Sequence, residues 1–124
     1  MIKIEIPSPD LEITKSNQVG DESEGDLSSV YGFTNYREIP RDKGGIFLFF
    51  DRNEQLLYVG KARKLRQRIK KSFEDNLSPI RKYRDEVYKI TVFVVDNPMD
   101  REIYETYIIN TLEAKYNIDK VFYK

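Results

Sequence analysis

The sequence predicts an α+β domain in which helices flank a three-stranded antiparallel sheet, in the order β-β-α-β-α. Three β-favouring segments and two segments with a helical pattern carry this prediction. A chain of 124 residues with 40% hydrophobic residues can supply one modest core. We therefore expect an N-terminal strand and acidic flexible arm over residues 1–39, followed by one folded domain over residues 40–124.

The first two strands are predicted to form a hairpin. The β-favouring run GGIFLFFD follows a break that begins at Pro40, and the polar stretch RNEQ separates it from LLYVG. The third strand is predicted in VYKITVFVVD. Nearer the N-terminus, the alternating MIKIEI could add an edge strand, whereas NQVGDESEGDLSS is polar and acidic and is expected to be a mobile arm or loop.

Two helices are predicted around these strands. In residues 61–73, apolar residues recur every three or four positions and basic residues fill the other faces. The apolar set is Ala62, Leu65, Ile69 and Phe73. The second helix is predicted from Pro98 to about residue 113, because Asn97 can act as its N-cap and proline suits the first helical position.

The composition excludes several classes of chemistry. With no cysteine and no histidine, the chain can form no disulfide, no Cys/His zinc site and no Cys or His nucleophile. It also lacks an apolar run near the roughly 20 residues of a membrane span, and its start lacks the layout of a signal peptide. We therefore expect a cytoplasmic protein without a membrane partner.

The net charge of +0 hides an uneven distribution of charge. Residues 61–84 hold ten basic side chains against two acidic ones, whereas residues 1–40 are acidic. Such a surface is typical of phosphate-backbone binding, with an ordinary solvated helix face as the alternative. The predicted DNA-binding residues are Arg63, Lys64, Arg66, Lys70, Lys71, Arg81, Lys82 and Arg84, with Phe73, Tyr83 and Tyr88 as candidate stacking residues.

Several short motifs together resemble a known family. They are Gly45-Ile46-Phe47, then Tyr58-Val59-Gly60-Lys61-Ala62-Arg63, then Leu65, Arg68 and Phe73, and finally Glu105 twelve residues before Asn117. This composite, from about residue 40 to residue 118, resembles the N-terminal nuclease domain of UvrC proteins, a member of the GIY-YIG nuclease superfamily. The resemblance implies a small GIY-YIG-like fold.

The resemblance also implies a role for each matched residue. Glu105 would be the ligand of Mg²⁺ or Mn²⁺, with a solvated helix glutamate as the alternative. Arg68 would clamp the scissile phosphate. The hydroxyl of Tyr58 would face that phosphate, and the ammonium group of Lys61 would favour its phenolate or orient the attacking water. Asn117 would hold the active-site loop by hydrogen bonds.

The sequence departs from the family pattern at two positions. Phe47 replaces the tyrosine of the first motif, so that hydroxyl is absent from the predicted catalytic set. Water activation would then fall to Tyr58 with Lys61, or to the metal, or the domain would be slow or inactive. Ala114 stands where the family tends to have proline, which mainly loosens a turn.

The resemblance implies a divalent-metal-dependent endonuclease that nicks one strand of DNA in repair or processing. The alternative is a catalytically impaired nucleic-acid-binding or repair-adaptor module, because of Phe47. Retention of Lys61, Arg68, Glu105 and Asn117 favours the enzyme. A third interpretation is a structural α+β protein with no nucleic-acid role. The expected partners are DNA and excision-repair proteins, and the sequence leaves the oligomeric state open.

Overall fold

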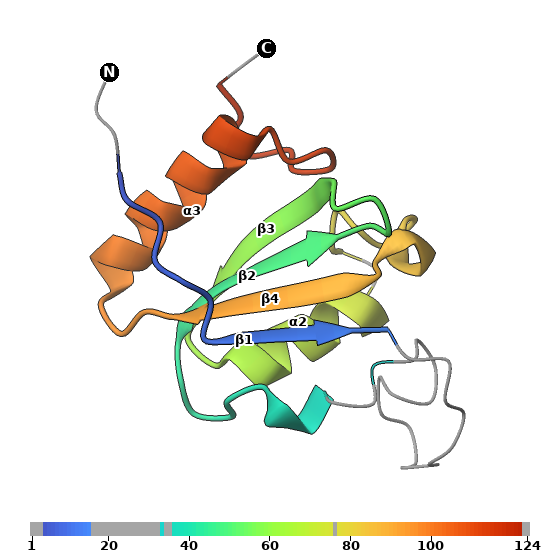
Figure 1. Ribbon diagram of the computed structural model, residues 1–124, viewed down its shortest axis with the longest axis horizontal. Coiled ribbons are helices and arrows are strands. Elements are labelled where there is room, and N and C mark those ends of the chain that lie inside the picture. Colours follow the sequence, from blue (N-terminus) through green and yellow to red (C-terminus); the bar gives the residue numbers. More distant parts are fainter. Residues whose placement is uncertain (1–3, 16–32, 34–35, 76, 123–124) are drawn as a thin grey trace.

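The computed structural model describes residues 4–15, 33, 36–75 and 77–122 of the chain (Figure 1). Within these residues a four-stranded antiparallel sheet packs with two α-helices. The elements are β1 (Leu11–Thr14), β2 (Gly45–Phe50), β3 (Leu56–Ala62), α2 (Leu65–Glu74), β4 (Lys89–Val94) and α3 (Pro98–Leu112), with short 3₁₀ turns at Tyr36–Glu38 and Arg84–Glu86. The α+β class is confirmed.

The sheet has four strands in the order β1-β4-β2-β3, so the predicted number of three is wrong. The added strand is Leu11–Thr14, which pairs antiparallel with β4 and buries Ile13. It lies after the MIKIEI segment, whose described residues 4–6 are not in a strand. Phe33 and Ile39 also belong to the buried core, so part of segment 1–39 contributes to the fold. The acidic stretch NQVGDESEGDLSS lies outside the described residues.

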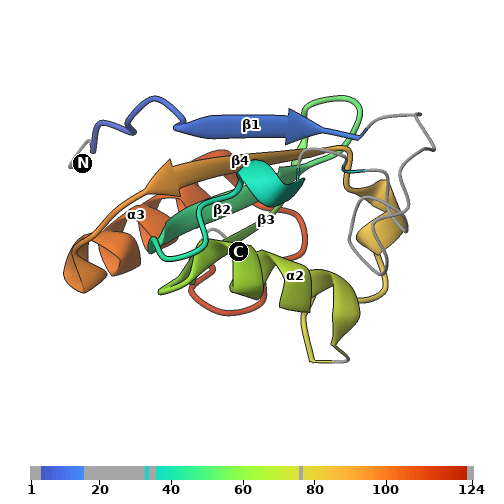
Figure 2. The same ribbon diagram turned by 90° about the horizontal axis from the view of Figure 1, so that it is seen from below.

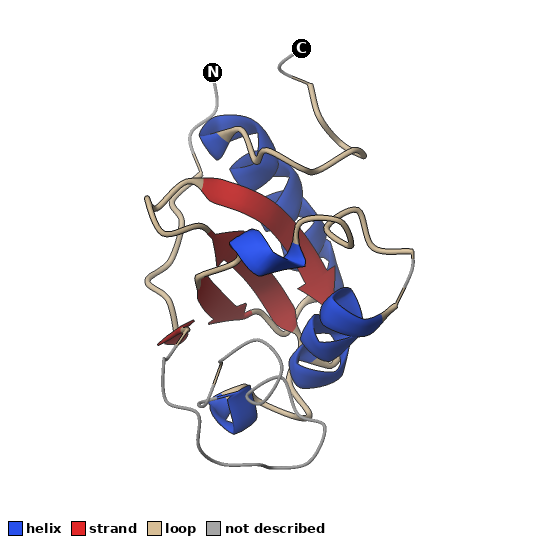
Figure 3. Cartoon of the chain, turned by 90° about the vertical axis from the view of Figure 1, so that its right-hand side faces the viewer, coloured by secondary structure: helices blue, strands red, loops and turns tan. Residues whose placement is uncertain are grey.

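Both faces of the sheet are buried, one under each helix (Figures 2 and 3). Phe47 and Phe49 point to the face covered by α2, whereas Ile46 and Leu48 point to the face covered by α3. This alternation explains why GIFLFF is apolar at every position rather than at every second one.

The first helix begins later than its apolar pattern predicts. Lys61 and Ala62 end β3, and α2 starts at Leu65. The second helix has the predicted N-cap, since Asn97 Oδ1 accepts hydrogen bonds from the backbone N–H groups of Met99 at 2.8 Å and Asp100 at 3.2 Å. The strands before the two helices, β3 and β4, finish at the same end of the sheet, so both helices start from that end (Figure 1).

The chain after α3 returns along the free side of β3. Glu113 takes a left-handed conformation with φ 52°, which ends the helix. The backbone N–H of Lys115 then donates to the carbonyl of Leu56 at 3.1 Å, and that of Tyr116 donates to the carbonyl of Leu57 at 2.8 Å. This return places the residues around position 117 beside the middle of β3. No helix among the described residues is long and apolar enough to cross a membrane.

Candidate active site

A cavity of about 130 Å³ gathers residues from β3, α3 and two loops. Tyr58 and Lys61 come from the end of β3, Glu105 from the middle of α3, and Asn117 from the returning C-terminal segment. The cavity is completed by Pro79, Ile109, Ile118, Asp119 and Lys120. The structure thus brings together four of the residues that the sequence motifs single out, although up to 59 positions separate them in the chain.

Glu105 is the buried carboxylate of this cavity, with 8% of its surface exposed. Its helix position explains the burial, because Ile108 and Ile109 follow it on the face packed against the sheet. Leu112, seven residues after Glu105 and the last residue of α3, is 47% exposed. Lys120 Nζ lies 2.6 Å from Glu105 Oε1 and compensates the buried charge.

Two further residues join this cluster that the sequence motifs do not include. Glu102 forms ion pairs with both Lys61 and Lys120. Hydrogen bonds from Lys120 and then from Lys61 lower the pKa of Glu102 to about 2. The only signals in the sequence are spacings: Glu102 precedes Glu105 by three residues on one helix face, and Lys120 follows Asn117 by three.

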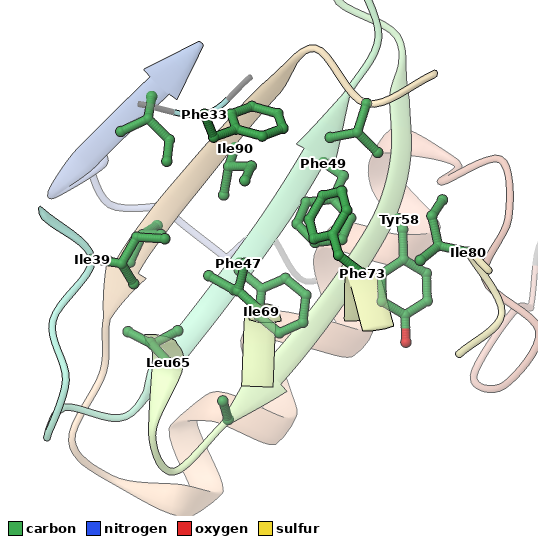
Figure 4. Packing of buried hydrophobic residues seen from close by; sticks show 14 of the residues in the cluster. Phe33, Ile39, Phe47, Phe49, Tyr58, Leu65, Ile69, Phe73, Ile80 and Ile90 are labelled. Carbon is green, nitrogen blue, oxygen red and sulfur yellow. The ribbon is translucent and has the colours of Figure 1, made fainter. Parts of the chain in front are cut away.

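Tyr58 has its ring in the core and its hydroxyl at the edge of the apolar cluster (Figure 4). Burial raises the pKa of Tyr58, and the charge of Glu105 raises it further, whereas Arg68 opposes the rise. Lys61 pairs with Glu102. The roles expected of Lys61, favouring the phenolate or orienting the attacking water, stay predictions, and the raised pKa of Tyr58 favours its phenol form.

Asn117 fastens the C-terminal segment to β3. Its Oδ1 accepts a hydrogen bond from the backbone N–H of Val59 at 2.9 Å, and its Nδ2 donates to the carbonyl of the same residue at 3.0 Å. Val59 immediately follows Tyr58, so the amide fixes the position of the C-terminal segment relative to the tyrosine. An amide side chain supplies the donor and the acceptor on two neighbouring atoms.

Arg68 lies on the face of α2 next to the sheet end and lines a second cavity of about 310 Å³. This cationic cavity is also lined by Lys61, which it shares with the Glu105 cavity. Arg68 Nη1 donates to Ser72 Oγ at 3.3 Å, one turn along the helix. A phosphate lying between the two cavities would therefore meet the guanidinium of Arg68 on one side and a cation held by Glu105 on the other.

Phe47 is fully buried, with ring contacts to Phe49 at 5.2 Å and to Tyr58 at 6.3 Å between centroids. Its ring lies across Gly60, where an added Cβ would fall 2.3 Å from Phe47 Cζ. Gly60 allows the close approach of the Phe47 ring, which a larger residue would block.

The predicted DNA-binding residues differ in accessibility. Arg63, Lys64, Lys71, Arg81 and Lys82 are exposed, and Lys70 is partly exposed beside Glu74.

Two of the predicted DNA-binding residues make hydrogen bonds within the protein. Arg66 donates to the carbonyls of Ile39 at 2.9 Å and Arg37 at 2.5 Å, and Arg84 donates to the carbonyl of Ser72 at 2.8 Å. These arginines hold loops against α2.

The aromatic residues predicted to stack on bases are divided in the same way. Phe73 is 2% exposed in the core, and the ring of Tyr88 takes the guanidinium of Arg52 at 4.8 Å, away from the Glu105 cavity. Tyr83 is the one of the three that borders a cavity next to the Glu105 site.

The family model of the UvrC-like GIY-YIG domain matches residues 43–118. The chain belongs to this family. The match spans every residue of the cavity contributed by β3 and α3, and it ends next to Asn117.

Several relatives are similar to this chain. The uncharacterized protein YurQ of Bacillus subtilis (strain 168) is 62% identical over 124 residues, the full length of both chains. UvrABC system protein C of Nautilia profundicola is 41% identical over 85 residues, and that of Aliarcobacter butzleri is 40% identical over 91 residues. These two matches cover 62% and 66% of this chain, but only 14% and 15% of the UvrABC proteins.

The fold is that of solved UvrC domains. The GIY-YIG N-terminal endonuclease domain of UvrC from Thermotoga maritima, in a crystal structure with magnesium, matches with a TM-score of 0.59 and 22% identity. The match covers 68% of this chain and 98% of that domain.

The residues of the Glu105 cavity fit a divalent cation of the hard class. The described residues contain no group of three or more acidic side chains that could enclose a metal. Glu105 is buried and already holds a cation, the ammonium group of Lys120. One carboxylate completed by water is a common arrangement for Mg²⁺, which keeps most of its hydration shell. Glu105 would hold such an ion.

Proposed function

We propose that this chain is a divalent-metal-dependent endonuclease that hydrolyses DNA phosphodiester bonds and nicks one strand. The observation that carries the proposal is the convergence of Glu105, Tyr58, Lys61 and Asn117 on one cavity. A buried carboxylate, a phenol and cations around a small cavity suit charge stabilisation at a phosphate. Family membership and the magnesium-bound Thermotoga maritima domain support the same chemistry.

Each residue has a role that its contacts support. A bound Mg²⁺ or Mn²⁺ would neutralise charge that builds up on the phosphate oxygens. Arg68 would stabilise the same charge from the cationic cavity. Because burial holds Tyr58 in its phenol form, its hydroxyl would orient the attacking water or donate to the phosphate. Asn117 is a positioning residue, since it acts through the backbone beside Tyr58.

The second candidate is a nucleic-acid-binding module without catalysis, and one observation favours it. Phe47 is fully buried and brings no hydroxyl to the first-motif position. The Thermotoga maritima domain has tyrosine-to-phenylalanine point mutants whose structures are described as bound to the catalytic divalent cation. Loss of one tyrosine hydroxyl is therefore compatible with metal binding in a UvrC domain, and a cleavage assay has to separate the enzyme from the inactive module.

The DNA would run over the exposed cations of α2 and of the loop before β4. Arg63, Lys64 and Lys71 lie at or near the cationic cavity, and Arg81 and Lys82 lie beyond the Glu105 cavity. Backbone contacts of this kind bind without reading sequence. We place the reaction in cytoplasmic DNA repair or processing, with excision-repair proteins as partners, because the UvrABC relatives share this domain.

The test compares the wild type with Glu105→Gln, which keeps the shape of the side chain and removes its charge. Mn²⁺ affinity is measured by calorimetry, and cleavage is measured on nicked, branched and intact duplexes with Mg²⁺ or Mn²⁺. We expect loss of measurable metal affinity and a roughly thousandfold fall in cleavage rate. Glu113→Gln is the matched control, because Glu113 is an exposed carboxylate of the same segment outside the cavity. Unchanged metal affinity in Glu105→Gln would remove Glu105 from the site.

A further inference from the structure

A third cavity, of about 320 Å³, adjoins the Glu105 cavity. Pro79, Asn117 and Ile118 line both of them, so the two cavities share a wall. Ile118 is 72% exposed although it is apolar, and it forms part of that wall. A strand of DNA whose scissile phosphate lies at Glu105 would therefore carry its next nucleotide past this third cavity.

Two stacked tyrosines form one side of this cavity, which we call the tyrosine cavity. The rings of Tyr83 and Tyr116 are parallel, with 3.8 Å between centroids and 2° between planes. The hydroxyl of Tyr116 donates to the carboxylate of Glu86, whose oxygens lie at 2.8 and 3.0 Å. Its backbone N–H is bound to the carbonyl of Leu57 in β3. The aromatic pair is therefore fixed before any ligand arrives.

The other sides of the tyrosine cavity are cationic. Arg81, Lys82 and Lys115 line it and are all exposed. Lys115 Nζ lies 5.2 Å from the centroid of the Tyr116 ring. Among the described residues that line the cavity, none is a carboxylate. Each ring of the pair covers one face of the other, and Lys115 lies over the Tyr116 ring, so Tyr83 is the ring that would take a base while the cations take its phosphates.

We propose that the tyrosine cavity binds the nucleotide next to the scissile phosphate, in a part of the DNA strand that is unpaired. This inference rests on the proposed function and specifies its substrate. In a duplex the neighbouring bases cover both faces of each base, so only an unpaired nucleotide can lay its base against a protein aromatic. The preferred substrates are therefore branched, flapped or locally melted DNA rather than intact duplex.

The test is equilibrium binding in EDTA, so that no strand is cut. The probes are a fluorescein-labelled single-stranded oligodeoxynucleotide and a counterpart of equal length and charge that lacks the bases. We expect the wild type to bind the base-bearing strand roughly tenfold more tightly, because one stacked base typically contributes at least that factor. Tyr83→Leu, which retains an apolar side chain against the core, should bring the two affinities close together.

Two further variants keep the test decisive if Tyr83→Leu folds poorly. The double variant Lys82→Ala with Lys115→Ala changes only exposed side chains. It should weaken the affinity for both probes equally and lower the salt slope, the slope of log affinity against log salt concentration, by roughly two. Arg52→Ala, a cation outside all three cavities, is the control and should change neither property.

Equal affinity of the wild type for the two probes would overturn the subsite, and so would an unchanged salt slope in the lysine variant. Those outcomes leave the proposed nuclease intact if the protein still binds DNA. A wild type that binds neither probe and cleaves no substrate would overturn both proposals.

Discussion

Lys120 Nζ lies 2.6 Å from the Glu105 oxygen Oε1, so the buried carboxylate of the site is bound to a cation from its own chain. Lys120 has φ 64°, a left-handed conformation that is uncommon for residues other than glycine. Asn110 Nδ2 donates to the carbonyl of Lys120 at 2.7 Å and holds this conformation. The ammonium group therefore occupies one of the two oxygens available to a metal ion.

We predict that Lys120→Met binds Mn²⁺ about three- to tenfold more tightly than the wild type. The reason is that Mn²⁺ no longer has to break the partly solvated ion pair between Lys120 and Glu105. The same variant should melt at a lower temperature without metal and recover when Mn²⁺ is added, since Glu105 is left without a counter-charge. Calorimetry and thermal melts measure the two effects. Lys70→Met is the control, because Lys70 pairs with Glu74 on α2 and does not line the Glu105 cavity. Weaker Mn²⁺ binding by Lys120→Met would contradict this account.

Asn117→Ala should destabilise the protein by about 2 to 4 kcal/mol, because two hydrogen bonds are lost and the N–H and carbonyl of buried Val59 are left without them. Urea denaturation measures this loss. Asn117→Asp keeps the acceptor but sets a carboxylate oxygen against the carbonyl of Val59, so it should also destabilise the protein. Asn53→Ala, on the exposed turn between β2 and β3, should change stability little. Equal stability of Asn117→Ala and wild type would exclude a fastening role.

Gly60→Ala should cost about 1 to 3 kcal/mol, since its methyl group would fall 2.3 Å from Phe47 Cζ. A smaller side chain at position 47 should relieve the clash, so the double variant Gly60→Ala with Phe47→Leu should be more stable than the sum of the single changes predicts. Gly44→Ala is the comparison, because the atoms nearest to its methyl group belong to the Arg101 side chain rather than to Phe47. Strict additivity at Gly60 and Phe47 would argue against this contact.

Phe47→Tyr should raise the single-turnover cleavage rate only modestly, if Tyr58 and the metal already activate the water. A lost general base typically costs on the order of 10² to 10⁴ in rate, so a gain of that size would assign the base to the missing hydroxyl. Tyr58→Phe should cost more than Phe47→Tyr gains. A wild type without activity that Phe47→Tyr converts into a nuclease would favour the binding module.

The ionisation of Tyr58 offers an independent check on its phenol form. Burial raises its pKa above the ordinary 10.0, so the stability linked to its proton is present below about pH 10 and is lost as the pH rises through the raised value. Absorbance titrations of the wild type and of Tyr58→Phe should differ in the most alkaline part of the curve, where Tyr58 ionises. Ionisation near neutral pH would restore the phenolate mechanism.

Reversal of charge along α2, with Lys64→Glu, Lys70→Glu and Lys71→Glu combined, should weaken binding to all duplexes about equally. It should also lower the salt slope by roughly two to three, because each phosphate contact releases a counterion. Affinity against salt concentration for two unrelated duplexes measures both effects. Lysine-to-arginine changes at the same three positions keep the charge and should keep the slope. Loss confined to one duplex would indicate sequence reading instead.

The family resemblance singled out Tyr58 and Glu105, and the structure brings both to one cavity, where their roles stay predictions. The partnership of Lys120 with Glu102 and Glu105 depends on where the C-terminal segment returns, which no local pattern encodes. Composition also cannot distinguish an arginine that meets solvent from one such as Arg84, which binds the carbonyl of Ser72.

The fold was predicted where segments are long and apolar. Strands β2, β3 and β4 and helix α3 carry such patterns, and each lies within a few residues of its predicted position. Strand β1 has only four residues, and only one of them, Ile13, is buried, so its pattern resembles that of a loop. Helix α2 begins late because Lys61 and Ala62 extend β3, and pairing with β2 outweighs their helical spacing.

Strand β3 is an edge strand of the sheet, and the unpaired backbone groups of an edge strand can hydrogen-bond to a strand from a second copy of a protein. Here the returning segment shields that border: Lys115 and Tyr116 bind the carbonyls of Leu56 and Leu57, and the Asn117 side chain binds both backbone groups of Val59. The segment that completes the Glu105 cavity therefore also covers backbone groups through which another strand could pair. We expect a proteolytic cut between α3 and Tyr116 to uncover the edge of β3 and to disturb the Glu105 cavity together.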